Sequence, residues 1–199
     1  MKHGGRYGID PGELRHRVEH LEYGAGGWQS MRTLWCAREG AGQTVYAPHA
    51  ARTEGDRFTM RFRGINPGHA LRCEGQEYLV AEVDGDSPAA ILVTAARVQF
   101  VDCIRRSPET NRANAYNRPT RTGTANAAFV GVLAEKYAGW AQETPGVALE
   151  NAVLLITAKG VTLESGDLVA AGGRDYSVRA CHLMDRWKNE YELVEERDA

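Results

Sequence analysis

The chain has 199 residues, of which 24 are basic and 26 acidic, and 43% are hydrophobic. These are ordinary values for a folded globular protein, and no run of about 18 apolar residues could span a membrane as a helix, so we expect no membrane partner. The first residues lack the apolar core of a signal peptide, which predicts synthesis in the cytoplasm. The four cysteines form no C-x-x-C pair and are expected to be reduced and mostly buried.

The first hundred residues alternate between apolar and polar side chains in short segments, the period of strands with one buried face. Glycine, proline and aspartate between the segments predict tight turns. Many short strands separated by turns predict an antiparallel barrel or sandwich. The expected strands are Leu14–Leu21, Arg57–Arg63, Glu77–Val83, Ile91–Thr94 and Val98–Val101.

A different composition follows in residues 104–122, which hold five arginines, one acidic residue and two prolines. Because the segment has too few apolar residues to form a core, we expect it to be a linker or a long surface loop. Guanidinium groups also suit phosphates or an acidic partner surface. The interface or phosphate-contact candidates are Arg105, Arg106, Arg112, Arg118 and Arg121.

Strand-like segments resume after this break, at Val153–Thr157, Asp167–Ala170, Asp175–Cys181 and Glu190–Val194. Between the Arg-rich segment and these strand-like segments, four residues have the spacing of an amphipathic helix: Phe129, Leu133, Tyr137 and Trp140. Gly131 and Gly139 disfavour a helix there, and the internal repeat described next aligns Leu133 with Trp35 in a strand-like segment. We therefore expect a strand.

The two halves match each other when the sequence is shifted by 98 residues. The shift aligns Gly68 with Gly166, Gly75 with Gly173, Tyr78 with Tyr176 and Val80 with Val178. The shared pattern predicts a hairpin whose second glycine takes a positive φ. We expect an all-β chain of two tandem small antiparallel β-barrels of the SH3-like type. The expected parts are a barrel at 1–103, an Arg-rich linker at 104–122 and a second barrel at 123–199.

No credible active site is found in the sequence, and we expect neither an enzyme nor a cofactor. His16, Glu19 and His20 fit the inverted zinc-protease motif, which requires a helix. Their neighbours alternate as in a strand, on which the two histidines would lie about 13 Å apart, too far for one zinc ion. The prediction is therefore of solvent-facing or interface histidines without a metal.

Residues 39–56 form a long stretch of polar and small residues between two expected strands. Long loops in compact β domains are often functional, and the alternative is a short helix that caps one end of a barrel. The sequence leaves both interpretations open.

Several segments of the first half carry a resemblance in their order and spacing. Leu14-Arg15-His16-Arg17 comes first, then a strand that ends Trp35-Cys36-Ala37, then Arg57–Arg63 and the hairpin around Tyr78 and Val80. Over residues 9–103 the chain resembles the head-closure (head–tail joining, or stopper) proteins of tailed bacteriophages. Members of that family are commonly a single domain, whereas this chain doubles it.

The resemblance implies a small β-barrel that assembles as a ring in the virion neck, after synthesis in the host cytoplasm. Such a ring closes the head after DNA packaging and provides the surface where the tail docks. Its implied partners are other copies of itself in a ring of six or twelve, a portal or adaptor protein above, a tail terminator or tail tube below, and the packaged DNA in the channel. A loop between early strands projects into the channel in this family, which makes gating candidates of Gln43, Thr44, Val45, Tyr46, His49 and Arg52.

Two alternatives remain. One is a tandem SH3-like barrel that acts as a binding module for nucleic acid or peptide, because the hairpin pattern is common to small barrels. The other lies within the neck, as a tail terminator or collar protein. Each half, divided after Cys103, carries 12 basic and 13 acidic residues, which suits side-by-side packing of subunits better than wrapping of DNA.

Overall fold

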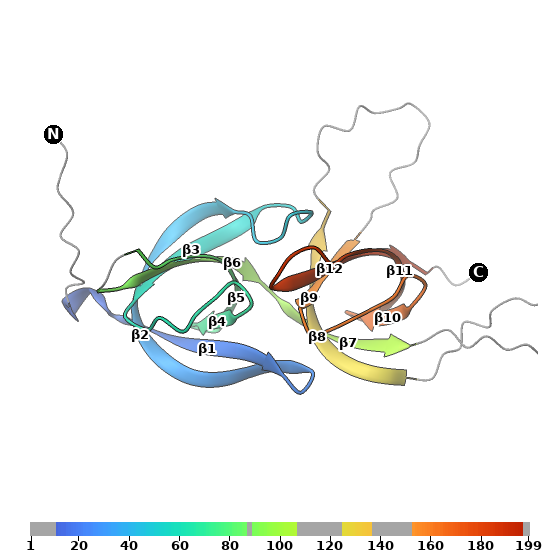
Figure 1. Ribbon diagram of the computed structural model, residues 1–199, viewed down its shortest axis with the longest axis horizontal. Coiled ribbons are helices and arrows are strands. Elements are labelled where there is room, and N and C mark those ends of the chain that lie inside the picture. Colours follow the sequence, from blue (N-terminus) through green and yellow to red (C-terminus); the bar gives the residue numbers. More distant parts are fainter. Residues whose placement is uncertain (1–10, 87–88, 107–124, 137–152, 197–199) are drawn as a thin grey trace, which may run out of the picture. The chain divides into compact units, whose positions relative to one another are not determined.

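The computed structural model describes residues 11–86, 89–106, 125–136 and 153–196 (Figure 1). These residues form one short 3-10 turn and twelve β-strands, so the expectation of an all-β protein is confirmed. None of the described residues lies in a helix long and apolar enough to cross a membrane. The strands are β1 (His16–Gly24), β2 (Gly27–Thr44), β3 (Thr53–Met60), β4 (Ala70–Cys73), β5 (Gln76–Asp84), β6 (Ile91–Val98), β7 (Phe100–Arg106), β8 (Ala125–Glu135), β9 (Val153–Ala158), β10 (Leu168–Ala171), β11 (Arg174–His182) and β12 (Lys188–Glu195).

The first six strands form a closed antiparallel barrel in the order β1-β2-β3-β6-β5-β4. Pairing of β1 with β4, which sets Val18 opposite Cys73, joins the first strand to the last in this order. Alternate side chains point inward, and each large apolar one that is fully buried stabilises the fold by about 1.5–3 kcal/mol. The core contains Val18, Cys36, Phe58, Met60, Ile65, Leu71, Cys73, Tyr78, Val80, Ile91, Val93 and Ala95.

The last six strands repeat this order as β7-β8-β9-β12-β11-β10, each strand six places later in the chain, and their sheet also closes. Here β7 pairs with β10, and Cys103 lies opposite Ala171. The core contains Cys103, Phe129, Leu155, Leu163, Val169, Ala171, Tyr176, Val178, Tyr191 and Leu193.

The 98-residue shift also holds in the registers of the strands. Tyr78 lies opposite Leu71 in the first sheet, and the shifted pair, Tyr176 and Val169, is found in the second. Each sheet has a bulge at the shifted position, after Val80 in one and after Val178 in the other. The hairpin predicted from the shared glycines is therefore present in both sheets.

The domain boundary differs from the predicted one. The chain divides between Gln99 and Phe100, and the short segments Ala25–Gly27 and His49–Ala51 group with the second unit. The predicted boundary at Cys103 and the predicted start of the linker at 104 are corrected, because Phe100–Arg106 forms the strand that pairs with both β8 and β10. Residues 107–122 of the expected linker lie outside the described residues.

The predicted excursion at 39–56 is also corrected. Strand β2 continues to Thr44 and β3 begins at Thr53, so only residues 45–52 connect them, and the alternative of a helix is not found there. The small residues that suggested a loop lie in strand, with a register shift between Gly40 and Gly42. By contrast, the strand expected around Phe129 and Leu133 is confirmed by β8, while Tyr137 and Trp140 lie outside the described residues.

Candidate functional site

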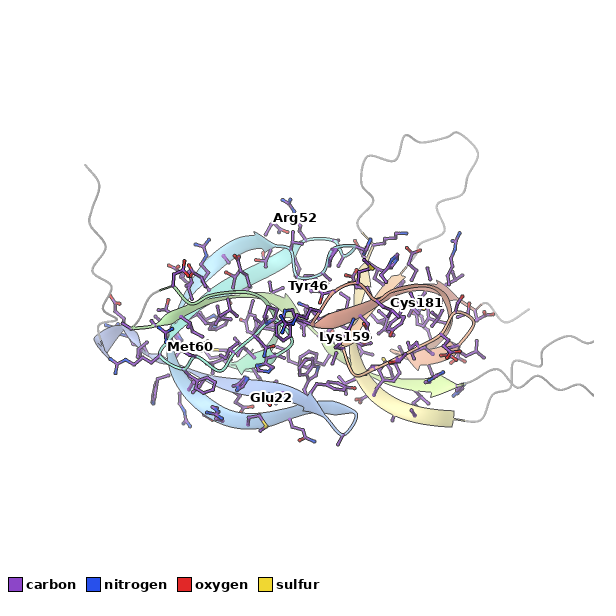
Figure 2. The ribbon with its side chains drawn as sticks, viewed as in Figure 1. Glu22, Tyr46, Arg52, Met60, Lys159 and Cys181 are labelled. Atoms are coloured by element: carbon purple, nitrogen blue, oxygen red, sulfur yellow. The ribbon has the colours of Figure 1, made fainter. Side chains whose placement is uncertain are left out.

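The residues predicted to form a channel loop lie in different environments. Gln43 and Thr44 belong to β2, where they pair with Glu54 and Thr53, and the Thr44 side chain is buried. Tyr46 follows directly and is buried too, with 7% of its surface exposed (Figure 2). Thr44 and Tyr46 are therefore buried, whereas Gln43 is exposed.

The other loop candidates are more exposed. Val45 is 51% exposed, and Arg52 is exposed at the far end of the connection (Figure 2). His49 groups with the second unit, where its Nδ1 lies 3.1 Å from a Glu190 carboxylate oxygen and its ring stacks on His182 with centroids 4.1 Å apart. Of the predicted set, Val45, His49 and Arg52 are therefore the exposed residues of the 45–52 connection, and His49 has Glu190 as a partner.

The two arginine candidates that can be described have acidic partners within the second unit. The Nε of Arg105 lies 2.8 Å from an Asp167 oxygen, and Arg106 lies 3.6 Å from Asp175. Both arginines therefore have an acidic neighbour within the second unit, and Arg106 stays partly exposed. Arg112, Arg118 and Arg121 lie outside the described residues.

A surface hollow on the first barrel gathers arginines that the sequence separates. The beginning of β1, the middle of β2 and the β4–β5 turn enclose a volume of about 470 Å³. Arg15, His16 and Arg17, which belong to the first segment of the resemblance to phage proteins, form one wall of this hollow. The lining consists of Arg15, His16, Arg17, Glu19, Thr33, Arg72, Glu74 and Gly75. We call this feature the arginine hollow.

Charges of both signs alternate in the arginine hollow. Arg72 lies between two carboxylates, 3.5 Å from Glu19 and 3.3 Å from Glu77. Glu74 lies 3.0 Å from His16 and 2.9 Å from Arg38, and its hydrogen bond with His16, with help from Arg38, lowers the pKa of its carboxyl group. A surface of this kind suits a partner with its own mixed charges.

Exposed apolar side chains continue the same face of β2. Trp35 is 58% exposed, and the Arg17 guanidinium lies 5.9 Å from its ring centroid. Met31, four residues earlier and on the same face of the strand, is 51% exposed. Tryptophan and arginine are the residues most enriched where proteins bind each other tightly, so this surface can carry a protein contact.

The prediction of solvent-facing or interface histidines in the His16–His20 string is wrong for His20. Its side chain has no exposed surface and contacts His69, whose Nδ1 lies 2.9 Å from the His20 Nε2. The strand period places His20 on the same face of β1 as Val18, a core residue. His16 lies on a strand as expected and remains partly exposed beside Glu74.

Sequence reasoning missed the arginine hollow because its walls come from separate parts of the chain. Arg72 reaches Arg17 and Glu19 only through the pairing of β1 with β4, and no local motif announces that pairing. The Arg15-His16-Arg17 string was a signal, but it indicated a family resemblance rather than a pocket. Comparison of the chain with protein-family models, with curated proteins and with solved structures finds no match.

Proposed function

We propose that the protein is a structural component of the tailed-phage neck, a ring-forming head–tail connector that closes the head after DNA packaging and offers a docking surface to the tail. The proposal starts from the resemblance over residues 9–103. The strands of the first barrel supply its elements in order, from the Arg-His-Arg string at the start of β1 to the β4–β5 hairpin. An all-β unit of this size is consistent with that role.

The observation that carries the proposal is the exposed surface formed by Arg17, Met31 and Trp35 beside the arginine hollow. Burying a half-exposed tryptophan and methionine against a neighbouring subunit removes apolar surface from water, which favours association. Arg17 over the indole adds a cation–π contact that strengthens when water is excluded.

Charge arrangement favours a protein partner over nucleic acid at this surface. Phosphate-binding grooves present unpaired basic groups, whereas Arg72 in the arginine hollow already has two carboxylate partners. A ring needs two different faces on each subunit that fit each other, and alternating charges specify such a fit.

The proposal also accounts for the two units of the chain. We regard the two units as tandem SH3-like barrels, since the second sheet repeats the strand order of the first. Six such chains would present twelve similar units, which would suit a position between twelvefold and sixfold neighbours in the neck. Within the loop at 45–52, the exposed Val45 and Arg52 are our candidates for residues that face the channel.

Substitution of the surface tryptophan tests the proposal. Trp35→Ala should weaken assembly of the chain into rings by about tenfold or more, because a central interface tryptophan contributes on the order of 2 kcal/mol. Native mass spectrometry over a concentration series measures the assembly. Met184→Ala is the matched control, since Met184 is fully exposed in the second unit and should leave assembly unchanged.

A second candidate function has one observation in its favour. Arg17 lies near the exposed Trp35 ring and lines the arginine hollow together with Arg15, an arrangement that also suits stacking on single-stranded nucleic acid. In that case the protein would stay monomeric at all concentrations, and its affinity for an oligonucleotide would fall steeply with salt and with Trp35→Ala. That combination of results would reject the ring and support the binding module.

A further inference from the structure

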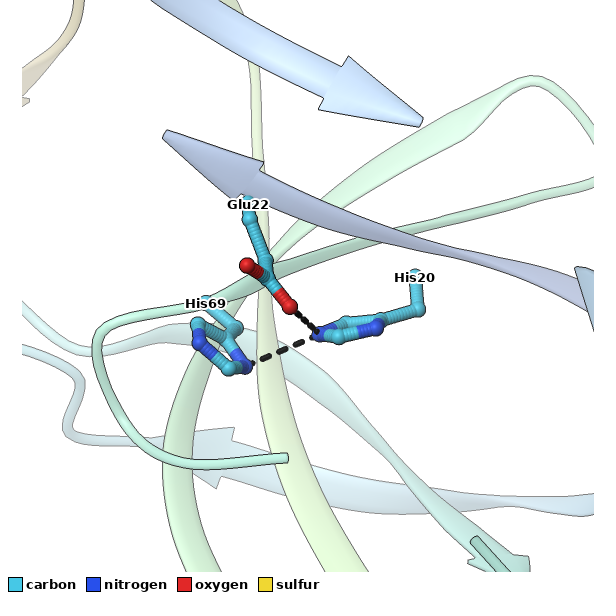
Figure 3. Close-up of side chains that lie close together, drawn as sticks. All are labelled: His20, Glu22 and His69. Carbon is cyan, nitrogen blue, oxygen red and sulfur yellow. Dashed lines mark hydrogen bonds and ion pairs between the residues drawn. The ribbon is translucent and has the colours of Figure 1, made fainter. Parts of the chain in front are cut away.

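Two histidines and a glutamate converge at one end of the first barrel (Figure 3). His20 and Glu22 are two residues apart in β1 and so share a face of the strand, while His69 comes from the turn just before β4. The His20 Nε2 lies 2.9 Å from the His69 Nδ1 and 3.8 Å from a Glu22 carboxylate oxygen. Donor atoms of the three residues all lie within 4.8 Å of one another.

The local sequence holds His69 firmly in this place. In the turn Asn66-Pro67-Gly68, the Gly68 N–H donates to the Asn66 side-chain oxygen at 2.8 Å, and the His69 N–H donates to the Asn66 carbonyl at 3.0 Å. The Val80 N–H of β5 donates to the His69 carbonyl at 3.2 Å. A ligand side chain on such a fixed backbone needs little reorganisation to bind.

Both imidazoles are suited to act as ligands. Burial lowers the pKa of both histidines below the ordinary value, and the neighbouring His69 lowers that of His20 further. Metal ions bind the neutral form of imidazole. Glu22 is 42% exposed, which leaves its carboxylate free to rotate toward the two nitrogens and one side open to water.

The second sheet has an ion pair at the corresponding position. Arg105 corresponds to His20, because Arg105 lies opposite Val169 as His20 lies opposite Leu71. Asp167 corresponds to His69 by the 98-residue shift. Arg105 and Asp167 form an ion pair at 2.8 Å. The first barrel has two imidazoles beside a carboxylate at this position, with no arginine among them, and a bound cation would supply a positive charge there.

We propose that His20, His69 and Glu22 bind one divalent transition-metal ion of the zinc type at the β1–β4 seam of the first barrel. Two imidazole nitrogens and one carboxylate oxygen are a zinc ligand set, and a water molecule completes the tetrahedron on the open side. The ion takes the place of the proton that now lies between His20 and His69. This site is independent of the ring proposed above.

Asn66 gives the proposal a distinctive consequence. Its side-chain nitrogen lies 3.1 Å from the His69 Nε2, which must therefore accept a hydrogen bond in the metal-free protein. With a metal on Nδ1, the Nε2 carries a proton and needs an acceptor instead. A carboxylate at this position accepts from both Gly68 and His69, so Asn66→Asp should strengthen metal binding by about tenfold.

Titration of the full chain with zinc alone, after removal of bound metal by a chelator, measures the site by calorimetry. We expect one zinc ion per chain and a thermal midpoint that rises with zinc concentration. His69→Gln and Glu22→Gln should each lower the affinity more than about tenfold. Cobalt in place of zinc should give the visible absorption of a tetrahedral site, which both variants lose.

His16→Gln is the matched control, since His16 lies on the same strand but outside the cluster. It should bind zinc as the unchanged protein does. The proposal is overturned if the unchanged protein binds no zinc, or if His69→Gln and Glu22→Gln, shown to be folded by circular dichroism, bind it with undiminished affinity. Weaker binding by Asn66→Asp would contradict the assigned coordination through His69 Nδ1.

Discussion

Asp56, on β3, lies buried in the first barrel and accepts hydrogen bonds from three side chains. Arg38 and Arg97 donate at 2.9 and 3.0 Å, and the Tyr78 hydroxyl donates at 2.7 Å. Burial alone would raise the pKa of this carboxyl group, but the hydrogen bonds from Arg97, Tyr78 and Arg38 together lower it below its ordinary 3.8. The charged form of Asp56 therefore stabilises the fold.

Asp56→Asn should lower the free energy of unfolding by about 2–4 kcal/mol at pH 7, because it leaves two arginines without their shared partner. Since the folded pKa is depressed, the contribution of Asp56 is complete above the ordinary pKa and is lost as pH falls through the folded one. The difference in unfolding free energy between Asp56→Asn and the unchanged protein should therefore be constant above about pH 5 and become smaller in acid.

Urea unfolding at a series of pH values measures that difference. Glu54→Gln is the control, because Glu54 bonds Arg97 from an exposed position and such pairs contribute at most about 1 kcal/mol. Equal losses in the two variants at pH 7 would argue against the buried network.

The cysteines agree with the prediction of reduced, mostly buried thiols. All four are free, three are buried and Cys181 is partly exposed. Burial raises the pKa of Cys103 to about 11 and that of Cys36 to about 12, so neither forms the reactive thiolate near neutral pH.

Alkylation of the folded protein at pH 8 should therefore modify Cys181 first, as mass spectrometry of the digested protein would show. In urea, all four cysteines should react at similar rates. Early labelling of Cys36 or Cys103 in the folded protein would contradict their placement in the two cores.

At the scale of elements, local patterns predicted most strands, because alternation and turn residues are local properties. They failed for His20, whose burial depends on the pairing of β1 with β4, and for β7, which reaches its partner β10 from more than 60 residues away. The arginine hollow could not be predicted for the same reason, since β1 and β2 build it together with β4 and the β4–β5 turn, which lie far from them in sequence.

The β4–β5 and β10–β11 turns offer a test of the repeat at this scale. Gly75 and Gly173 have φ angles of 81° and 79°, and nothing lies within 4 Å of a Cβ added at either. Gly75→Ala and Gly173→Ala should each cost about 1 kcal/mol of unfolding free energy, from the backbone conformation alone. Thermal unfolding measures both.

Gly160→Ala serves as the control for those two variants. A Cβ at Gly160 also meets open space, and its φ is not positive, so the substitution should not destabilise the protein. A loss at Gly160 equal to that at Gly75 would show that the turn conformation is not the cause.

At the scale of the whole molecule, the 98-residue shift in the sequence predicted a relation that the structure extends to the order of all six strands in each sheet. The sequence revealed it at the hairpins because glycine, tyrosine and valine are each required there by the backbone or the core. The relation between the halves could not be recognised at β1 and β7, because their side chains differ and because they are not 98 residues apart. Val18 of β1 lies opposite Cys73, and the residue of β7 at the corresponding position, opposite Ala171, is Cys103.

If the protein is the head–tail connector proposed above, it assembles into a ring that joins a portal–adaptor complex. The most direct measurement is the mass and symmetry of the purified protein, alone and mixed with such a complex, by native mass spectrometry and electron microscopy of single particles. We expect a closed ring of six or twelve copies seated on the complex. A stable monomer that never joins the complex would contradict it.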